Sequence, residues 1–295
     1  MATERTVSIA ERLVGHERPC FIVAEVGINH NGDLNLAKRL IALARDKGCD
    51  GVKFQKRTVD VVYSPEELAR PRDSPFGSTV GDLKRGLEFG LTEYQEIDRY
   101  CRELGIMWFA SPWDELSVDF LERFDPPCYK IPSARLTDLG LVRYARKTGR
   151  PLIMSTGMST MEEIQEAVDA ADEDKLVLLH CTSTYPSTES ELNLGVIPQL
   201  MEAFDCPVGY SGHEVGVATS VMAVVLGACV VERHVTLDRA MWGSDQAASL
   251  EPHGLELLTK YIRTWPVARG DGRKCVYDSE KPILKKLRRM GCAEV

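Results

Sequence analysis

The stretch from Phe21 to Gly32 reads FIVAEVGINHNG, a short apolar run rich in β-branched residues and followed directly by polar residues and glycine. Along most of the chain, runs of this kind alternate with longer segments whose apolar residues recur at i, i+3 and i+4. The alternation indicates repeated strand–helix units and a parallel sheet. We count eight cycles in 295 residues, and one barrel needs roughly 250. We therefore predict an α/β fold, a single (β/α)8 TIM barrel with a short C-terminal tail.

The expected strands share a short apolar core and a polar exit. They are Phe21–Val26, Gly51–Gln55, Met107–Ala110, Cys128–Ile131, Leu152–Ser155, Leu176–His180, Pro207–Tyr210 and Val230–Val235. The clearest amphipathic helices between them are Leu36–Lys47, Glu93–Leu104, Leu139–Lys147, Met161–Ala171 and Val215–Leu226. Polar residues at every strand exit are typical of a barrel whose active site lies at the carboxyl ends of the strands. The sequence contains no GxGxxG or Walker motif, which an open nucleotide-binding sheet would favour.

Two segments interrupt the repeat. Residues 59–91, rich in proline, glycine and charge, are too long for a simple loop, and we expect them to fold over the site as a lid. Residues 269–295 are too short for a domain and are expected to form an arm. The predicted organisation is therefore a catalytic barrel over residues 1–268, including an N-terminal lead-in and the lid, followed by the arm.

Composition excludes several functions. The formal net charge of −8 disfavours binding to nucleic acid or an anionic membrane, so an anionic substrate needs a few lysines focused in a pocket. The start of the chain lacks the apolar core of a signal peptide, and we expect a cytoplasmic protein. Nine cysteines without a CxxC pair argue against a disulfide framework or a structural zinc site. Of these, only Cys181 lies beside the expected chemistry.

Two histidines follow neighbouring strands of the expected barrel. His213 comes after the seventh strand and His234 lies in the eighth, so both should project toward the same end. Two imidazoles can hold one divalent metal ion, with water or substrate oxygen completing its coordination. A single barrel histidine is more often structural, but the joint placement favours a metal site.

Lysines and serines recur at successive strand exits. They are Lys53, Lys130, Ser133, Ser155, Ser183 and Ser211. A buried ammonium group is costly unless it meets an anion, so this set can bind a phosphate and a carboxylate. The alternative is that the lysines form ion pairs with Glu25 or Asp245. Acid, base and hydroxyl-binding groups around the same rim come from Glu25, Asn29, Gln55, Tyr185, Glu232 and Asp245.

Eight ordered motifs carry a family resemblance. FIVAEVGINHNGD, GVKFQ, LEFG, KIPSA, STGMS, LHCTSTYP, VGYSGHE and ERHVTLD…GSDQAASLEP together resemble the sialic acid synthase (N-acetylneuraminate synthase) family from about Phe21 to Pro252. The resemblance implies a transferase that condenses phosphoenolpyruvate with a sugar aldehyde, giving a 2-keto-3-deoxy sugar acid and phosphate by C–O cleavage. It also implies a homodimer.

The resemblance further implies residue roles. Phosphoenolpyruvate would be bound by Lys53, Lys130, Ser133, Ser155, Ser183 and Ser211, and Mn2+, or else Mg2+ or Co2+, by His213 and His234. Asn29, Gln55, Tyr185 and Asp245 would bind the sugar, and Glu25 would stabilise the cation at C2 or deprotonate water. His213 and His234 would share in catalysis through the metal.

The sequence departs from the family pattern on the sugar side. Arg135 stands where an acidic residue is common, and Gln246 where histidine is frequent. The sequence ends at Val295 without the antifreeze-like domain that lends an arginine to the sugar, so we expect Arg72, Arg135 or a tail residue to replace it. A synthase of shorter 3-deoxy acids, such as octulosonate or heptulosonate, and a non-catalytic barrel remain the alternatives.

Overall fold

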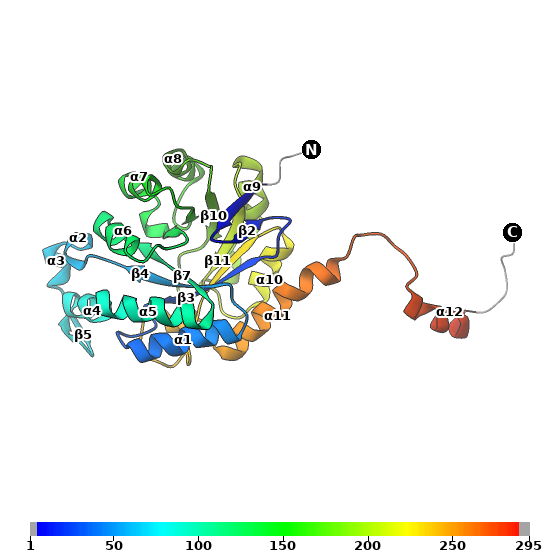
Figure 1. Cartoon of the computed structure of the whole chain (residues 1–295), viewed down its shortest axis with the longest axis horizontal. Helices are drawn as coiled ribbons and strands as arrows, with labels where there is room; N and C mark the ends of the chain where they lie inside the picture. Colours follow the sequence, from blue (N-terminus) through cyan, green and yellow to red (C-terminus); the bar gives the residue numbers. More distant parts are fainter. Residues whose placement is uncertain (1–4, 289–295) are drawn as a thin grey trace.

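Eight parallel strands close into a barrel in the computed structural model, which describes residues 5–288 (Figure 1). In spatial order the strands are β10 (Leu176–Cys181), β11 (Val208–Gly212), β12 (Val230–His234), β3 (Phe21–Gly27), β4 (Gly51–Lys56), β7 (Met107–Pro112), β8 (Tyr129–Ile131) and β9 (Leu152–Ser155). All eight coincide with predicted strands, and the predicted fold class is confirmed. Continuous apolar runs made the strands recognisable because both of their faces are buried.

Helices surround the barrel. They are α1 (Leu34–Asp46), α5 (Leu91–Leu104), α6 (Glu115–Glu122), α7 (Leu139–Lys147), α8 (Met161–Ala171), α9 (Val196–Ala203), α10 (Ala218–Val225) and α11 (Pro252–Arg269). Side-chain caps fix several starts. For example, Asp33 accepts hydrogen bonds from the backbone of Asn35 and Leu36 at the start of α1. The α10 helix begins three residues later than predicted, because residues 215–217 form a loop.

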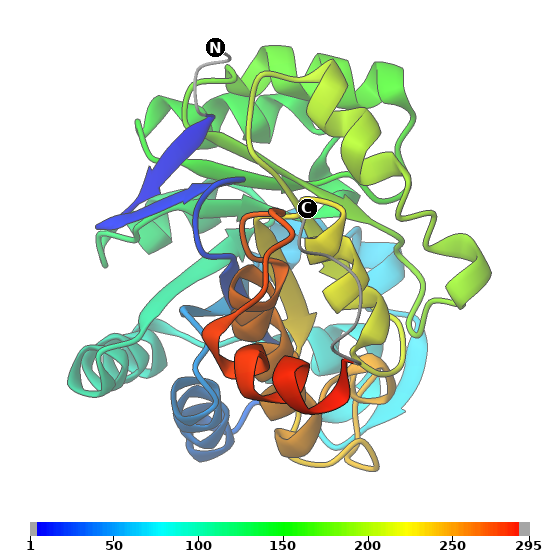
Figure 2. The same cartoon turned by 90° about the vertical axis from the view of Figure 1, so that its right-hand side faces the viewer.

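An N-terminal hairpin closes the amino-terminal end of the barrel. Its strands β1 (Thr6–Ile9) and β2 (Arg12–Gly15) pair antiparallel. Val7, Ile9 and Val14 are buried against the apolar first halves of the barrel strands. Figure 2 shows the hairpin, in dark blue, on the side from which the C-terminal segment extends. The hairpin therefore fills one end of the barrel with apolar side chains, and the polar side chains of the candidate site lie at the other end.

The insertion after β4 folds into short elements. They are α2 (Val59–Val62), α3 (Pro65–Leu68), β5 (Pro71–Ser74), β6 (Gly77–Thr79) and α4 (Val80–Leu87). The Phe76 ring contacts the Trp242 ring edge-on, with centroids 6.2 Å apart, and Phe89 stacks on His30 at 4.0 Å. The insertion therefore packs against loops at the carboxyl ends of the first and last barrel strands.

The chain leaves the barrel after α11. In Figure 1 the segment beyond α11, which carries α12 (Lys281–Leu287), extends away from the barrel. The α12 helix has no buried residue. Within residues 5–288, no helix combines the length and apolar character needed to cross a membrane.

Close packing of the barrel strands predicts a stability effect at Gly209 in β11. A Cβ at this position would lie 2.6 Å from the Val230 carbonyl oxygen and 2.7 Å from Leu179 Cδ2. Gly209→Ala should therefore lower the free energy of unfolding by about 1–3 kcal/mol. Gly254→Ala in α11, where the nearest atom lies at 3.5 Å, is the control and should be neutral or slightly stabilising. Urea denaturation of both variants measures the difference, and equal stabilities would contradict the packing argument.

Candidate active site

A cavity of about 260 Å³ opens at the carboxyl ends of the barrel strands. Its walls include eleven residues that the sequence analysis singled out for binding or catalysis: Glu25, Lys53, Gln55, Lys130, Ser133, Ser183, Tyr185, Ser211, His213, Glu232 and His234. The other lining residues are Ser111, Trp113, Pro132, Ala134, Met158 and Cys181. The size suits small molecules rather than a macromolecule.

Strand periodicity explains why these side chains converge. Successive side chains of a strand point to opposite faces, so residues two apart share the barrel interior. Lys53 and Gln55 of β4 are such a pair, and so are Glu232 and His234 of β12. Each pair lies near the carboxyl end of its strand, beyond the apolar packing that fills the barrel.

Four buried charged side chains meet in the cavity wall. Lys53 Nζ lies 2.8 Å from Glu25 Oε2 and 3.6 Å from Glu232 Oε1. Lys130 Nζ lies 3.4 Å from the same Glu232 oxygen. Ser211 donates a hydrogen bond to Glu232 at 3.2 Å, and Gln55 donates one to Glu25 at 2.8 Å. Glu232 is thus a counter-ion shared by both lysines.

The protonation equilibria of this cluster are unequal. Burial disfavours the Glu232 carboxylate, but the two ammonium groups outweigh it and hold its pKa at about 2. Burial lowers the pKa of Lys130 more than Glu232 raises it, whereas two carboxylates keep the pKa of Lys53 raised despite burial. Lys130 is therefore the less compensated cation, and an anion in the cavity would stabilise its charged form.

Glu25 has the opposite tendency. Burial raises the pKa of its carboxyl group, and the adjacent Lys53 opposes that effect only in part. Its side chain is 1% exposed and lines the cavity. A buried carboxyl group with a raised pKa holds its proton more readily than an exposed one, which is a property of a general acid or base.

The two histidines lie next to each other in the cavity wall. Their ring centroids are 5.4 Å apart. Nδ1 of His213 lies 2.8 Å from the Thr182 carbonyl oxygen, an acceptor, so Nδ1 carries a proton. Burial lowers the pKa of His213, but contacts with Cys181 and the Thr182 carbonyl outweigh it and raise the pKa, so Nε2 must lose its proton before it can bind a metal ion. Burial lowers the pKa of His234 to about 3, so this ring is neutral, and its buried Nδ1 has no hydrogen-bond partner among the described residues.

In their neutral form, two neighbouring imidazoles can each donate a ring nitrogen to one divalent metal ion. Among residues 5–288 no group of three or more His, Cys, Asp and Glu side chains is placed to hold a metal. The two histidines would therefore be joined by water or substrate oxygen in completing the coordination. Asp245 Oδ2 lies 3.8 Å from His234 Nδ1, close enough to orient this ring through a small movement.

Serines line the wall next to Lys130. Ser133 accepts a hydrogen bond from the backbone N–H of Gly157 at 3.1 Å. A Cβ at Gly157 would lie only 2.3 Å from Ser183 Oγ and 2.8 Å from Ser133 Oγ. Glycine in the STGMS segment therefore allows two hydroxyl groups and a backbone donor to crowd together, an arrangement suited to an oxyanion.

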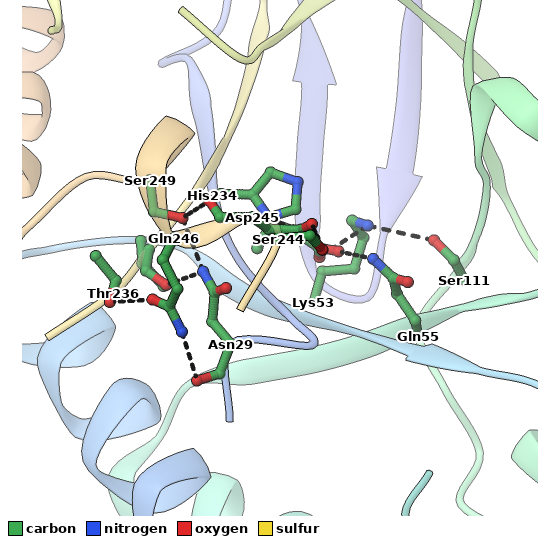
Figure 3. A network of polar contacts seen from close by, with 12 residues as sticks. Asn29, Lys53, Gln55, Ser111, His234, Thr236, Ser244, Asp245, Gln246 and Ser249 are labelled. Atoms are coloured by element: carbon green, nitrogen blue, oxygen red, sulfur yellow. Dashed lines mark hydrogen bonds and ion pairs between the residues drawn. The ribbon is translucent and has the colours of Figure 1, made fainter. Parts of the chain in front are cut away.

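Three residues singled out from the sequence do not line the cavity. Ser155 is fully buried, and its hydroxyl has no hydrogen-bond partner in the described part of the chain. Asn29 donates to the Val235 carbonyl at 2.9 Å and to Ser249 at 2.7 Å, which ties two loops together. Asp245 is the third residue outside the cavity lining. In Figure 3, Asp245 and His234 lie between Asn29 with its partner Ser249 and the group of Lys53, Gln55 and Ser111.

The chain is similar to known proteins over most of its length. The chain matches the NeuB family over residues 40–274, which is most of its length. The chain belongs to the NeuB family.

Relatives of known name support this membership. N-acetylneuraminate-9-phosphate synthase from Homo sapiens is 40% identical over 289 residues, covering 96% of this chain and 80% of the human protein. N,N'-diacetyllegionaminic acid synthase from Legionella pneumophila is 37% identical and covers 93% of this chain and 80% of that protein. The crystal structure of N-acetylneuraminic acid synthetase from Leptospira borgpetersenii superposes with a TM-score of 0.84 at 29% identity, covering 96% of each chain.

The structure of this NeuB-family chain adds residues that the sequence analysis did not assign to the site. Ser111 accepts a hydrogen bond from Lys53 at 3.2 Å, and Trp113 lines the cavity beside it. Both belong to the segment ASPWD, residues 110–114, at the end of the predicted strand Met107–Ala110, and the polar residues at that strand exit were the available signal. Cys181 lies 3.8 Å from His213 Nδ1, and contacts with His213 and Lys130 outweigh burial and lower its pKa to about 7.

Arg135 lies at the edge of the site. Its guanidinium carbon is 5.7 Å from the centre of the Trp113 ring, and its side chain pairs with Asp138 at 3.5 Å. Arg135 and Trp113 both line a second pocket, which adjoins the cavity at Trp113 and also contains Val61. Arg72 is exposed on the β5–β6 hairpin. Arg135 is therefore better placed than Arg72 to meet one end of a ligand.

The shared counter-ion predicts the effect of Glu232→Gln. This change keeps the side-chain volume but leaves both buried lysines with one carboxylate, so the free energy of unfolding should fall by about 3–5 kcal/mol. Inorganic phosphate should restore part of the loss. Glu103→Gln is the control, because its partner Arg99 is half exposed and such surface pairs contribute little. Chemical denaturation with and without phosphate tests this, and an unchanged stability in Glu232→Gln would contradict it.

Proposed function

We propose that this chain condenses phosphoenolpyruvate with an open-chain sugar aldehyde to form a nonulosonic acid and phosphate. The observation that carries the proposal is the buried cluster of Lys53, Lys130, Glu25 and Glu232 beside two adjacent histidines. Membership of the NeuB family and relatives named as nonulosonic acid synthases support the same reaction.

Phosphoenolpyruvate matches the cationic half of the cavity. Lys130 lacks full compensation, so a carboxylate or phosphate there gains a charge-assisted hydrogen bond. The hydroxyl groups of Ser133 and Ser183 supply further donors on the same side, and the Gly157 backbone N–H donates to Ser133. Lys53 donates to Glu25 and Ser111, at 2.8 and 3.2 Å. Its third donor, which has only the longer 3.6 Å contact with Glu232, can turn toward the ligand because an ammonium group has three.

His213 and His234 would hold the divalent ion, for which we propose Mn2+, with Mg2+ or Co2+ as substitutes. When bound, such an ion supplies Lewis acidity that polarises the aldehyde oxygen. The protein contributes the alignment of the rings, through Thr182 for His213 and Asp245 for His234. Tyr185, whose ring lies 4.0 Å from that of His213, covers the same corner of the cavity.

The reaction forms one C–C bond and one C–O bond to water, and it breaks the C–O bond between C2 and phosphate. The two protons of the water end on the former aldehyde oxygen and on phosphate. C3 of phosphoenolpyruvate attacks the aldehyde carbon, and positive charge develops at C2. Glu25 stabilises that charge as a carboxylate or accepts the proton of the water that adds at C2. The tetrahedral intermediate then expels phosphate with the former bridging oxygen, and the 2-keto acid remains.

The acceptor would occupy the side of the cavity lined by Gln55, Tyr185 and Trp113, with Asp245 nearby. Arg135, at the adjoining pocket, would meet its far end. We propose a hexose-type acceptor such as N-acetylmannosamine, mannose or their 6-phosphates. Phosphate release measured against this panel, with mass spectrometry of the products, tests the proposal. A protein that releases no phosphate with any aldose would overturn it.

Removal of either lysine predicts a selective loss of donor binding. Lys53→Met and Lys130→Met should each weaken phosphoenolpyruvate binding about tenfold or more, because a hydrogen bond to a charged group contributes about 1.5–3 kcal/mol. Lys56→Met is the matched control, since Lys56 lies on the same strand but pairs with Glu88 at 3.2 Å outside the cavity. Calorimetric titration decides the question. Unchanged donor affinity in both lysine variants would assign them to structural ion pairs alone.

Metal dependence gives a second prediction. Chelation should abolish turnover, and added Mn2+, Mg2+ or Co2+ should restore it in the wild type but not in a His213→Ala, His234→Ala double variant. His253→Ala, at an exposed position at the start of α11, should behave as the wild type. Full turnover by the metal-stripped double variant would refute the assignment.

A further inference from the structure

A second buried ion pair lies directly behind the two histidines. Arg233 Nη1 is 2.9 Å from Glu214 Oε1, and the two side chains are 0% and 1% exposed. Glu214 follows His213 in the chain, and Arg233 precedes His234 on β12. The pair therefore joins the two segments that carry the candidate metal ligands.

Strand geometry keeps this pair out of the cavity. On β12 the side chains of Glu232 and His234 line the cavity, so Arg233, between them, points to the opposite face of the strand. Arg233 is paired in register with Gly212, the last residue of β11. Neither Glu214 nor Arg233 lines the cavity, and so neither is available to contact a substrate there.

The carboxylate of Glu214 is fully engaged. Its Oε1 accepts hydrogen bonds from Thr219 and Ser220, at 2.8 and 2.7 Å, and its Oε2 accepts one from Tyr210 at 2.9 Å. A Cβ at Gly212 would lie 2.4 Å from Oε2, so glycine is needed for the carboxylate to fold back against β11. Glu214 thus ties the loop after His213 to both β11 and α10.

Arg233 holds the same loop from the other side. Its guanidinium donates to the backbone carbonyls of Glu214 and Gly216 and to the Ser220 hydroxyl. These bonds fix residues 214–216 in the loop that delays the start of α10. An apolar pair could fill the same volume without the desolvation cost, but it could not bond the loop carbonyls.

We infer that Glu214 and Arg233 are positioning residues that hold His213 and His234 at the separation needed to share one metal ion. The inference rests on the metal site proposed above. Thr182 sets the rotation of the His213 ring, whereas the ion pair sets the backbone position of His213 relative to β12. Loss of the pair should release the loop and weaken metal binding without removing a ligand.

The test is a calorimetric titration of the full chain with Mn2+ in the absence of substrates. Arg233→Met should weaken Mn2+ binding about tenfold or more, in the range seen when residues that support metal ligands are replaced. Arg233→Lys, which keeps the charge but not the forked geometry, should lie between Arg233→Met and the wild type. Glu214→Gln should also weaken binding, and it serves if Arg233→Met does not fold.

The matched control is Asp50→Asn. Asp50 pairs with Arg12 and Arg263, both at 2.6 Å, at the opposite end of the barrel strands. Its variant should lose stability but retain the Mn2+ affinity of the wild type. Wild-type affinity in both Arg233→Lys and Glu214→Gln would overturn the positioning role while leaving the metal site intact. Failure of the wild type to bind Mn2+ would instead overturn the metal site, and this inference with it.

Discussion

The burial of Lys53 and Lys130 at the carboxyl ends of the barrel strands is the constraint on which the site depends. Each ammonium group loses its hydration, so carboxylates must lie within a few ångströms. Glu25 and Glu232 meet that need from β3 and β12, the neighbouring strands of the closed barrel. The compensation is complete for Lys53 and incomplete for Lys130, which leaves the cavity receptive to an anion.

The barrel itself could be predicted from the sequence because its strands are buried on both faces and read as short apolar runs with polar exits. The N-terminal hairpin could not. Its strands are only four residues long, and their burial depends on distant segments of the chain, which Arg5 also contacts through the backbone carbonyls of Met201 and Phe204. The composition of residues 59–91 likewise predicted an insertion after β4, but it did not predict the short helices and the hairpin that the insertion forms.

Most candidate site residues could be proposed from strand exits, because barrel closure brings successive exits to one mouth. The partners of the lysines were harder to predict, since counter-ions come from strands that closure makes adjacent. Glu25 and Asp245 were the partners considered from the sequence. Glu25 does pair with Lys53, but the second counter-ion is Glu232. Asp245 instead lies beside His234. Asn29 and Ser155 show the limit of the method, since a polar residue near an exit can also bond to a loop or remain buried in the wall.

The central claim is that this cavity binds phosphoenolpyruvate and cleaves its C–O bond. The most direct measurement uses phosphoenolpyruvate labelled with oxygen-18 at the bridging oxygen, together with a hexose-type aldose and Mn2+, and follows the phosphate by phosphorus NMR. C–O cleavage predicts that the released phosphate retains the label and that release requires the aldose. Unlabelled phosphate would show P–O cleavage, and labelled release that does not depend on the aldose would show hydrolysis. Either result would contradict the claim.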